Sequence, residues 1–329
     1  MKRFFLGMTA AVFLFAAIMG GQAWAQKRLA LVMPTAINDN GFSQSAYSGL
    51  KRIRESLGVK TAYSDNTPTT KFVSTLSNYA AQGFDVVVGH GFEFGDPIMR
   101  IAKKYPKTKF FAVAGMVNVD GKVPNVVSLQ PATHEGAYVA GAFAGLITKK
   151  NSIGILGGFP FPAIVVQLEA FREGVKATNP SAKSVIVYIS TISDVAKGKE
   201  AAMALISVGA DVVYHVAGSA GNGVLQAAQQ RGVMAIGWGM DQRVQAPKAV
   251  VASHLVDWGG TWLNVASAYF KTGKFTPGVI VLPMKTGVTD LSEIHGPFPQ
   301  SVKDKVMRIR QDVIDGKIKV PFIPKPRPN

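Results

Sequence analysis

Glycine, aromatic and amide residues gather in six short segments of this 329-residue chain. Glycine lets a ligand approach the backbone closely, Phe, Tyr and Trp can stack on a flat ring, and amides can hydrogen-bond to its edge. The six segments are residues 36–42, 90–96, 114–116, 158–161, 217–223 and 238–242. Their composition predicts a binding site for a small aromatic molecule, assembled from several loops.

Two histidines in or beside these segments are candidates for ligand contacts. His90 and His215 each follow a run of valines, and a neutral imidazole both donates and accepts a hydrogen bond. In the alternative interpretation, loop backbone satisfies both rings. The other candidates in the six segments are Phe42, Gly91, Phe92, Met116, Phe159, Ser219, Trp238 and Asp241.

The residues needed for several kinds of catalysis are missing. The chain has no cysteine, which excludes disulfides, thiolate metal sites and a cysteine nucleophile. None of the 5 histidines forms an i, i+4 pair of the kind that binds zinc. Residues 218–223 are glycine-rich, but they lack the spacing and the position of a dinucleotide-binding loop, and the chain has no Gly-x-Ser-x-Gly elbow. We therefore expect no cofactor, no metal and no enzyme activity, with an exported α/β enzyme as the weaker alternative.

The elements that position the candidates follow from hydrophobic patterning. Short apolar runs alternate with amphipathic segments, which is typical of parallel sheets flanked by helices. The predicted strands are 29–33, 60–63, 86–89, 110–114, 126–129, 153–157, 184–189, 212–216 and 233–237. The predicted helices are 42–57, 69–82, 97–104, 161–178, 196–208 and 223–231. Trp258, Trp262 and Tyr269 have the spacing of the buried face of a further helix.

The chain is long enough for two domains. Residues 83–90 and 209–215 both place Gly and Asp before a valine strand that ends near a His, which predicts two domains of like topology. Ligands of open parallel sheets bind where the carboxyl ends of the strands meet. The candidate segments follow predicted strands, so we expect them to converge on one site.

The first 25 residues have the organisation of a signal peptide. Lys2 and Arg3 precede an apolar run over residues 4–19, and Ala23-Trp24-Ala25 forms a small-x-small cleavage site. The alternative is a membrane anchor, which needs about 20 apolar residues. Without a cysteine, the exported chain cannot carry a lipid anchor at its new N-terminus. We predict a freely soluble periplasmic protein.

The formal net charge of +16 raises the question of a nucleic-acid partner. The basic residues are scattered along the chain, whereas a nucleic-acid footprint would cluster on one element. We therefore expect a solvated basic surface and no nucleic acid.

One ordered set of motifs resembles a known family. The segment Asn38-Asp39-Asn40-Gly41-Phe42-Ser43-Gln44-Ser45-Ala46-Tyr47-Ser48-Gly49 resembles the opening motif of the basic membrane protein family of substrate-binding proteins, which includes purine nucleoside receptors. Further similar segments follow in the family's order: residues 83–85, 91–92, 105–106, 134–141, 217–223 and 239–242. Together they cover nearly the whole chain after residue 25.

The resemblance implies an α/β fold of the type I periplasmic-binding-protein class, in which two doubly wound Rossmann-like lobes are joined by a hinge. It also implies an ABC transporter permease as partner, with membrane contact only through that permease, and a monomer. We expect one lobe to comprise residues 26–130 and about 254–284. The other would comprise residues 131–253 and about 285–329.

The resemblance also implies roles for individual residues. Asp39, with Asn38 or Asn40 as alternatives, would be a polar contact to a base. Tyr47 would form one face of a stacking sandwich, and the loop that begins at Gly218 would supply the contact from the second lobe. Asp257 is a further candidate, because relatives carry a ligand-contacting or hinge segment at this place.

Two departures from the family pattern bear on the ligand. Nucleoside-binding relatives carry an acidic residue where this chain has Gly115-Met116, and their Asp-x-Asp-Gln is replaced here by Gly239-Met240-Asp241-Gln242. The missing acid would hold ribose hydroxyls, and Trp238 could fill the space of the sugar. We therefore expect a purine base or another flat heterocycle more than a nucleoside. A ligand-sensing receptor module of the same fold is the alternative to transport.

Overall fold

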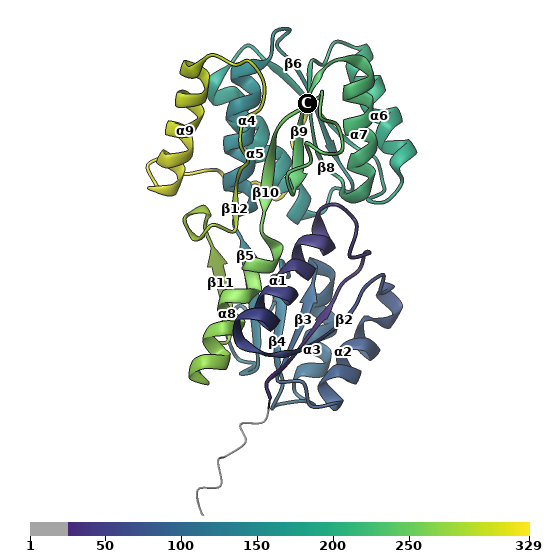
Figure 1. The fold of residues 1–329 in the computed structure, drawn as a ribbon, viewed down its shortest axis with the longest axis vertical. Helices are drawn as coiled ribbons and strands as arrows, with labels where there is room; N and C mark the ends of the chain where they lie inside the picture. The colour runs from purple at the N-terminus through teal and green to yellow at the C-terminus, as the bar shows by residue number, and fades with distance from the viewer. Residues whose placement is uncertain (1–25) are drawn as a thin grey trace, which may run out of the picture.

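The computed structural model describes residues 26–329, and the predicted signal peptide lies outside these described residues. The chain forms two lobes, each built on a six-stranded sheet (Figure 1). In the first sheet every strand pair is parallel. Its order is β11 (Gly278–Leu282), β5 (Val126–Pro131), β4 (Lys109–Val113), β3 (Val86–His90), β1 (Arg28–Val32) and β2 (Lys60–Ser64).

The second sheet repeats this arrangement and ends on one antiparallel pair, β12 with β10. Its order is β12 (Thr289–Leu291), β10 (Val250–Val256), β9 (Met234–Gly239), β8 (Val212–Val216), β6 (Ser152–Gly157) and β7 (Lys183–Tyr188). Strands β3 and β8, which carry the two similar sequence segments, occupy equivalent places in the two sheets. The prediction of two lobes of like, doubly wound topology is confirmed.

Helices flank both sheets. The first lobe has α1 (Phe42–Leu57), α2 (Phe72–Ala81), α3 (Gly95–Ala102) and α8 (Trp258–Thr272), with the 3-10 turns η1 (Thr69–Lys71) and η2 (Phe92–Phe94). The second has α4 (Thr133–Ile147), α5 (Pro162–Thr178), α6 (Val195–Ser207), α7 (Gly221–Arg231) and α9 (Gln300–Ile314), with η3 (Gly218–Ala220). Between residues 26 and 329, none of these helices combines the length and the apolar character needed to cross a bilayer.

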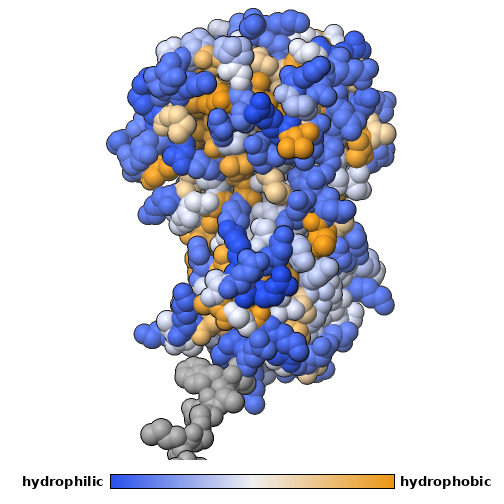
Figure 2. Space-filling model, viewed as in Figure 1, coloured by the Kyte–Doolittle hydropathy of each residue, from blue (hydrophilic) through white to orange (hydrophobic). Residues whose placement is uncertain are grey.

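The core of the first lobe follows the period of a strand. Successive side chains of a strand point to opposite faces of the sheet. Leu29 and Leu31 pack in one buried cluster with residues of α1 and α8, and Ala30 and Val32 pack in another with residues of α2 and α3. Both faces are therefore covered, as parallel sheets require. Hydrophilic side chains spread over the outer surface of both lobes in Figure 2.

In the second lobe, helices α4 and α5 cross in close contact. A Cβ atom on Gly141 would lie 1.9 Å from the carbonyl oxygen of Phe171, and one on Gly174 would lie 2.0 Å from that of Tyr138. Only glycine fits at these two positions, and the backbones touch as a result. Helix α4 is buried along nearly its whole length, so it has no polar face. This crossing sets the position of α5, whose first half reaches the cleft between the lobes.

The chain passes between the lobes three times, after β5, after β10 and after β11. The second passage is fixed to α1: Ser45 Oγ donates to the carbonyl oxygen of Val256 (3.1 Å) and accepts from the amide of Trp258 (3.0 Å). Asp257 caps α8 by accepting from the amide of Gly260 (2.8 Å) and forms an ion pair with Arg52 of α1 (2.7 Å). These bonds hold the second passage against α1 of the first lobe.

Candidate functional site

A cavity of ≈ 380 Å³ lies between the two lobes. This volume falls within the range of about 300–1,000 Å³ that is usual for small-molecule sites. The lining comes mainly from loops at the carboxyl ends of strands in both sheets, where a doubly wound fold places its ligand. The non-aromatic lining residues with polar side chains are Thr35, Asp39, Thr69, Glu93, Gln167 and Ser219.

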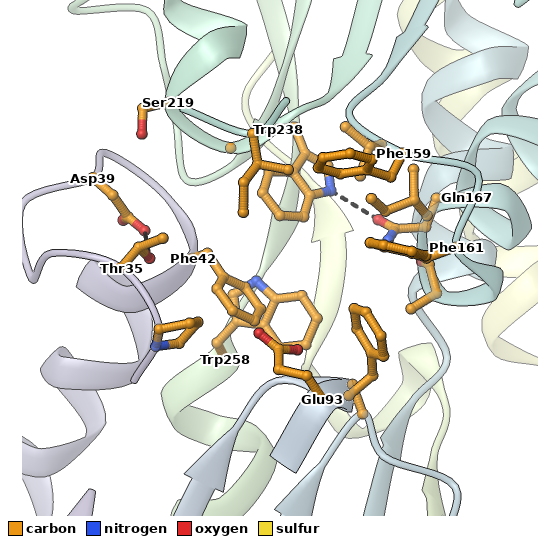
Figure 3. A pocket seen from close by; sticks show the side chains of 18 of the residues that line it. Thr35, Asp39, Phe42, Glu93, Phe159, Phe161, Gln167, Ser219, Trp238 and Trp258 are labelled. Atoms are coloured by element: carbon orange, nitrogen blue, oxygen red, sulfur yellow. Dashed lines mark hydrogen bonds between the residues drawn. The ribbon is translucent and has the colours of Figure 1, made fainter. Parts of the chain in front are cut away.

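Six aromatic side chains surround the cavity, three from each lobe (Figure 3). They are Phe42, Phe92 and Trp258 from the first lobe and Phe159, Phe161 and Trp238 from the second. The Phe92 and Phe161 ring centroids are 5.0 Å apart, and both rings are about two-fifths exposed (40% and 39%). This pair therefore spans the cleft at the solvent edge, whereas Trp238 and Trp258 approach each other at the buried end, with centroids 6.4 Å apart.

Phe42 is held from behind by His90. The two rings stack with their centroids 3.9 Å apart, and His90 Nε2 donates to the carbonyl oxygen of Phe42 (3.2 Å). Burial lowers the pKa of His90 to about 3, so the ring is neutral at physiological pH. His90 orients the aromatic wall and does not line the cavity itself.

Trp238 is fixed by two buried amides. Its Nε1 donates to Gln167 Oε1 (2.8 Å), and its backbone amide donates to Gln242 Oε1 (2.8 Å). The same Gln242 oxygen accepts from His215 Nε2 (2.9 Å). Burial lowers the pKa of His215 to about 4, so this ring is also neutral. His215 therefore helps to hold Trp238 in place through Gln242.

Asp39 organises the loop before α1. Its carboxylate accepts four hydrogen bonds: from Thr35 Oγ1 (2.8 Å) and from the backbone amides of Gly41 (3.1 Å), Ser43 (2.9 Å) and Gln44 (3.1 Å). A negative charge at the start of a helix is also favoured by the helix dipole. The lone pairs of Asp39 are thus occupied by the chain, although the residue lines the cavity.

Several polar side chains of the cavity lining keep free hydrogen-bonding capacity. Trp258 Nε1 is buried and has no hydrogen-bond partner among residues 26–329. Burial also raises the pKa of Glu93, whose carboxyl group meets only its own backbone among the described residues. The hydroxyl groups of Thr69 and Ser219 also form no side-chain hydrogen bond within residues 26–329, so the lining offers both donors and acceptors to a ligand.

The structure brings seven of the sixteen predicted site residues to the cavity. These are Asp39, Phe42, Phe92, Phe159, Gly218, Ser219 and Trp238. It places the other nine outside the lining: Asn38, Asn40, Tyr47, His90, Gly91, Met116, His215, Asp241 and Asp257.

The nine residues have other positions and contacts. The Tyr47 ring packs against Tyr63, with centroids 5.0 Å apart, on another side of α1. Met116 is 58% exposed. The Asn40 carbonyl accepts from Gln242 Nε2 across the cleft (3.4 Å). Asp241 Oδ1 accepts a hydrogen bond from the backbone amide of Arg243 in its own loop (3.1 Å). Asp257 belongs to the connection between the lobes.

Glu93, Gln167 and Trp258 are among the lining residues that the sequence does not predict. Glu93 stands in a predicted segment, but a lone Glu in a loop carries no pattern. Gln167 lies inside α5, where nothing distinguishes it from a surface amide. The helical spacing of Trp258 predicts a core residue, and that interpretation is incomplete, since the ring both packs in the core and lines the cavity.

The buried histidines predict a pH dependence of stability. The folded-state pKa is about 3 for His90, about 4 for His215 and about 3 for His254, against 6.5 for an unperturbed ring. Above pH 6.5 the rings are neutral in both states. Below pH 6.5 the unfolded chain takes up protons that the folded chain refuses, so the free energy of unfolding falls by about 1.4 kcal/mol per pH unit for each ring.

Urea unfolding at pH 7.5, 6.0 and 5.0 measures this effect. Unfolding of the His254→Gln variant should take up about one proton fewer than unfolding of the wild-type chain, so its free energy of unfolding should depend less steeply on pH. This expectation holds whatever the stability of the variant at pH 7.5. An unchanged slope in this variant would contradict the burial of an uncharged His254 ring.

Comparisons with known proteins agree with this architecture. The family model Bmp, described as ABC transporter substrate-binding protein PnrA-like, matches residues 26–323. A Lactococcus lactis protein named ABC transporter nucleoside-binding protein BmpA is 32% identical over 307 residues, covering 87% of this chain and 86% of that protein. A Listeria innocua protein named CD4+ T-cell-stimulating antigen is 30% identical over 321 residues, covering 90% of this chain and 88% of that protein.

Solved structures show the same fold. An ABC transporter solute-binding protein from Aeropyrum pernix superposes with a TM-score of 0.78 at 22% identity, covering 90% of this chain and 94% of that chain. The corresponding protein from Conexibacter woesei gives a TM-score of 0.76 at 24% identity, covering 90% and 99%.

Proposed function

Since this chain belongs to the Bmp family of PnrA-like ABC transporter substrate-binding proteins, we propose that it captures a flat aromatic heterocycle of the purine-base class and delivers it to an ABC permease. One observation carries the proposal: six aromatic rings from both lobes enclose a cavity whose lining also includes the Glu93 carboxyl group and Trp258, which has an unpaired indole N–H within residues 26–329. Aromatic rings prefer offset-stacked or edge-to-face contacts with a flat guest, and the donor and the carboxyl group would bind the edge of that guest.

Capture by lobe closure is part of this proposal. The lobes touch beside the cavity: a Cβ atom on Gly239 would lie 3.3 Å from the Cα of Gly41, and Gln242 reaches the Asn40 carbonyl. Closure about the three connecting segments would shield the ligand from water and bring together a surface that spans both lobes, which a permease can recognise. On this proposal the chain is exported through residues 1–25, works in the periplasm and performs no catalysis.

The preference for a base over a nucleoside rests on the residues that come after β4. Ala114 turns the chain in the left-handed region (φ 61°), and Gly115 and Met116 come next, with Met116 facing solvent. No carboxylate stands at this position to hold ribose hydroxyls. The relative named as a nucleoside-binding protein supports a ligand that contains a nucleobase, and the Gly115-Met116 sequence after β4 supports the free base.

Tryptophan fluorescence tests the proposal, because Trp238 and Trp258 line the cavity. The chain from residue 26 should show saturable changes with adenine, hypoxanthine or guanine at micromolar concentrations or below. The matching nucleosides should bind at least 10-fold more weakly, about 1.4 kcal/mol. Tighter binding of nucleosides would contradict the base preference. Absence of saturation with every base and nucleoside would overturn the purine class.

A further inference from the structure

Glu93 is the cavity carboxyl group that the chain leaves without a counter-charge. Of the two acidic residues in the lining, Asp39 is bonded to four donors of its own loop. Glu93, in turn η2, forms no ion pair within residues 26–329. Figure 3 shows its carboxyl group directed into the cavity.

The local backbone holds Glu93 in this place. Gly91 has φ 135°, a conformation that residues with side chains rarely adopt. A Cβ atom at Gly91 would also lie 2.6 Å from Glu93 Oε2 and 2.8 Å from Glu93 Cδ. The φ of Gly91 therefore favours glycine at this position, and the absence of a side chain there leaves the space that the Glu93 carboxyl group occupies.

The rest of the cavity has the electrostatic character of a cation site. No Lys, Arg or His is present among its described lining residues. The faces of aromatic rings carry negative charge density and attract cations. An unpaired, partly buried carboxylate is costly unless it meets a positive charge or N–H donors. A ligand that brings such a group would remove this cost.

We propose that Glu93 selects planar aromatic ligands that present a cationic or N–H-rich nitrogen group, such as an amino or amidine group, and rejects phosphorylated ones. The inference rests on the proposed function, because it concerns the same cavity. A protonated amidine or two adjacent N–H groups can donate to both carboxylate oxygens at once. A phosphate would instead meet the charge of Glu93 with no cation beside it.

The first experiment compares benzamidine with benzamide by isothermal titration calorimetry. The two molecules have nearly the same planar shape, but only benzamidine is cationic at pH 7.5. The wild-type chain should bind benzamidine about 10- to 100-fold more tightly than benzamide, as expected for a charge-assisted bond. Glu93→Gln should abolish this preference. Glu55→Gln, which makes the same charge change at an exposed site of α1, should retain the preference.

A second comparison uses adenosine and adenosine monophosphate, which differ only by the phosphate. The nucleotide should bind the wild-type chain more weakly than adenosine, and Glu93→Gln should narrow that difference. An equal affinity of the wild-type chain for benzamidine and benzamide would overturn the role of Glu93, as would a preference that survives in Glu93→Gln. If no purine binds but the benzamidine preference depends on Glu93, the selector role stands and the purine class fails. If purines bind equally to the wild-type chain and to the Glu93→Gln variant, the proposed function stands and the selector role of Glu93 fails.

Discussion

Replacing Phe42 with alanine should weaken binding of the preferred base by about 10- to 100-fold, whereas Tyr47→Ala should leave the affinity within about threefold. Both residues are aromatic and partly buried on α1. Only Phe42 lines the cavity, where it is fixed between His90 and Trp258 at ring-centroid distances of 3.9 and 4.9 Å. Loss of one stacking ring costs about 1–3 kcal/mol per base.

Calorimetry with the base that binds best in the fluorescence titration measures both variants. Tyr47→Ala is the matched control, because it removes an aromatic ring from the same helix without touching the cavity. Equal losses in the two variants would contradict the assignment of Phe42 to the binding wall. A loss in Tyr47→Ala alone would restore the stacking role that the family resemblance implies for Tyr47.

Gly141→Ala should destabilise the second lobe by about 3 kcal/mol or more. Helix propensity alone predicts the opposite sign, since alanine is favoured over glycine by about 1 kcal/mol inside a helix. A Cβ atom at this position would lie 1.9 Å from the carbonyl oxygen of Phe171, so α4 and α5 would have to move apart. Overpacking of a tight contact usually costs about 1–3 kcal/mol, and a backbone carbonyl has little room to yield.

Thermal and urea unfolding measure this change. Ala177→Gly, at an exposed position of α5, is the control for the exchange of alanine and glycine and should cost only about 1 kcal/mol. A stabilised Gly141→Ala variant would show that propensity outweighs the helix contact. A destabilised variant should also bind the base more weakly, because Gln167 and neighbouring residues in the first half of α5 line the cavity.

The sequence predicts the framework well because period and run length are local signals. Helix α1 has the predicted bounds, since its apolar stripe ends at Gly58 in the left-handed conformation (φ 62°). Strand β8 also has its predicted bounds. Helix α4 has no predicted counterpart, because a helix buried on nearly all sides lacks the alternation of apolar and polar residues that marks an amphipathic one.

The site is only partly predictable, because the sequence does not show which side of a helix faces the cleft or which polar groups are already hydrogen-bonded within the chain. Phe42 and Tyr47 are five residues apart, which turns their side chains by about 140° around the axis of α1. A motif fixes both residues on one helix, but the packing of that helix decides which one faces the cleft. Likewise, the sequence places Asp39 at the loop tip, while the four donors that occupy its carboxylate become visible only once the loop is folded.

His90 and His215 illustrate the same limit. Both stand near the carboxyl end of a central strand, as predicted, and could have faced either the ligand or the chain. In the structure neither ring lines the cavity: His90 stacks on Phe42, and His215 forms a hydrogen bond with Gln242. A Cβ atom on Gly221 would lie 2.0 Å from His215 Cε1, so the ring fills the space under the start of α7. Each ring bonds to the chain through Nε2, while its buried Nδ1 has no hydrogen-bond partner among residues 26–329.

A crystal structure of the chain with adenine tests the central claim most directly. We predict that the adenine ring lies between Phe42 and Trp258 of the first lobe and the three aromatic residues of the second lobe. Its amino group should face Glu93, and a ring nitrogen should accept from Trp258 Nε1. Adenine bound elsewhere, with the interlobe cavity closed and empty, would contradict the proposed site.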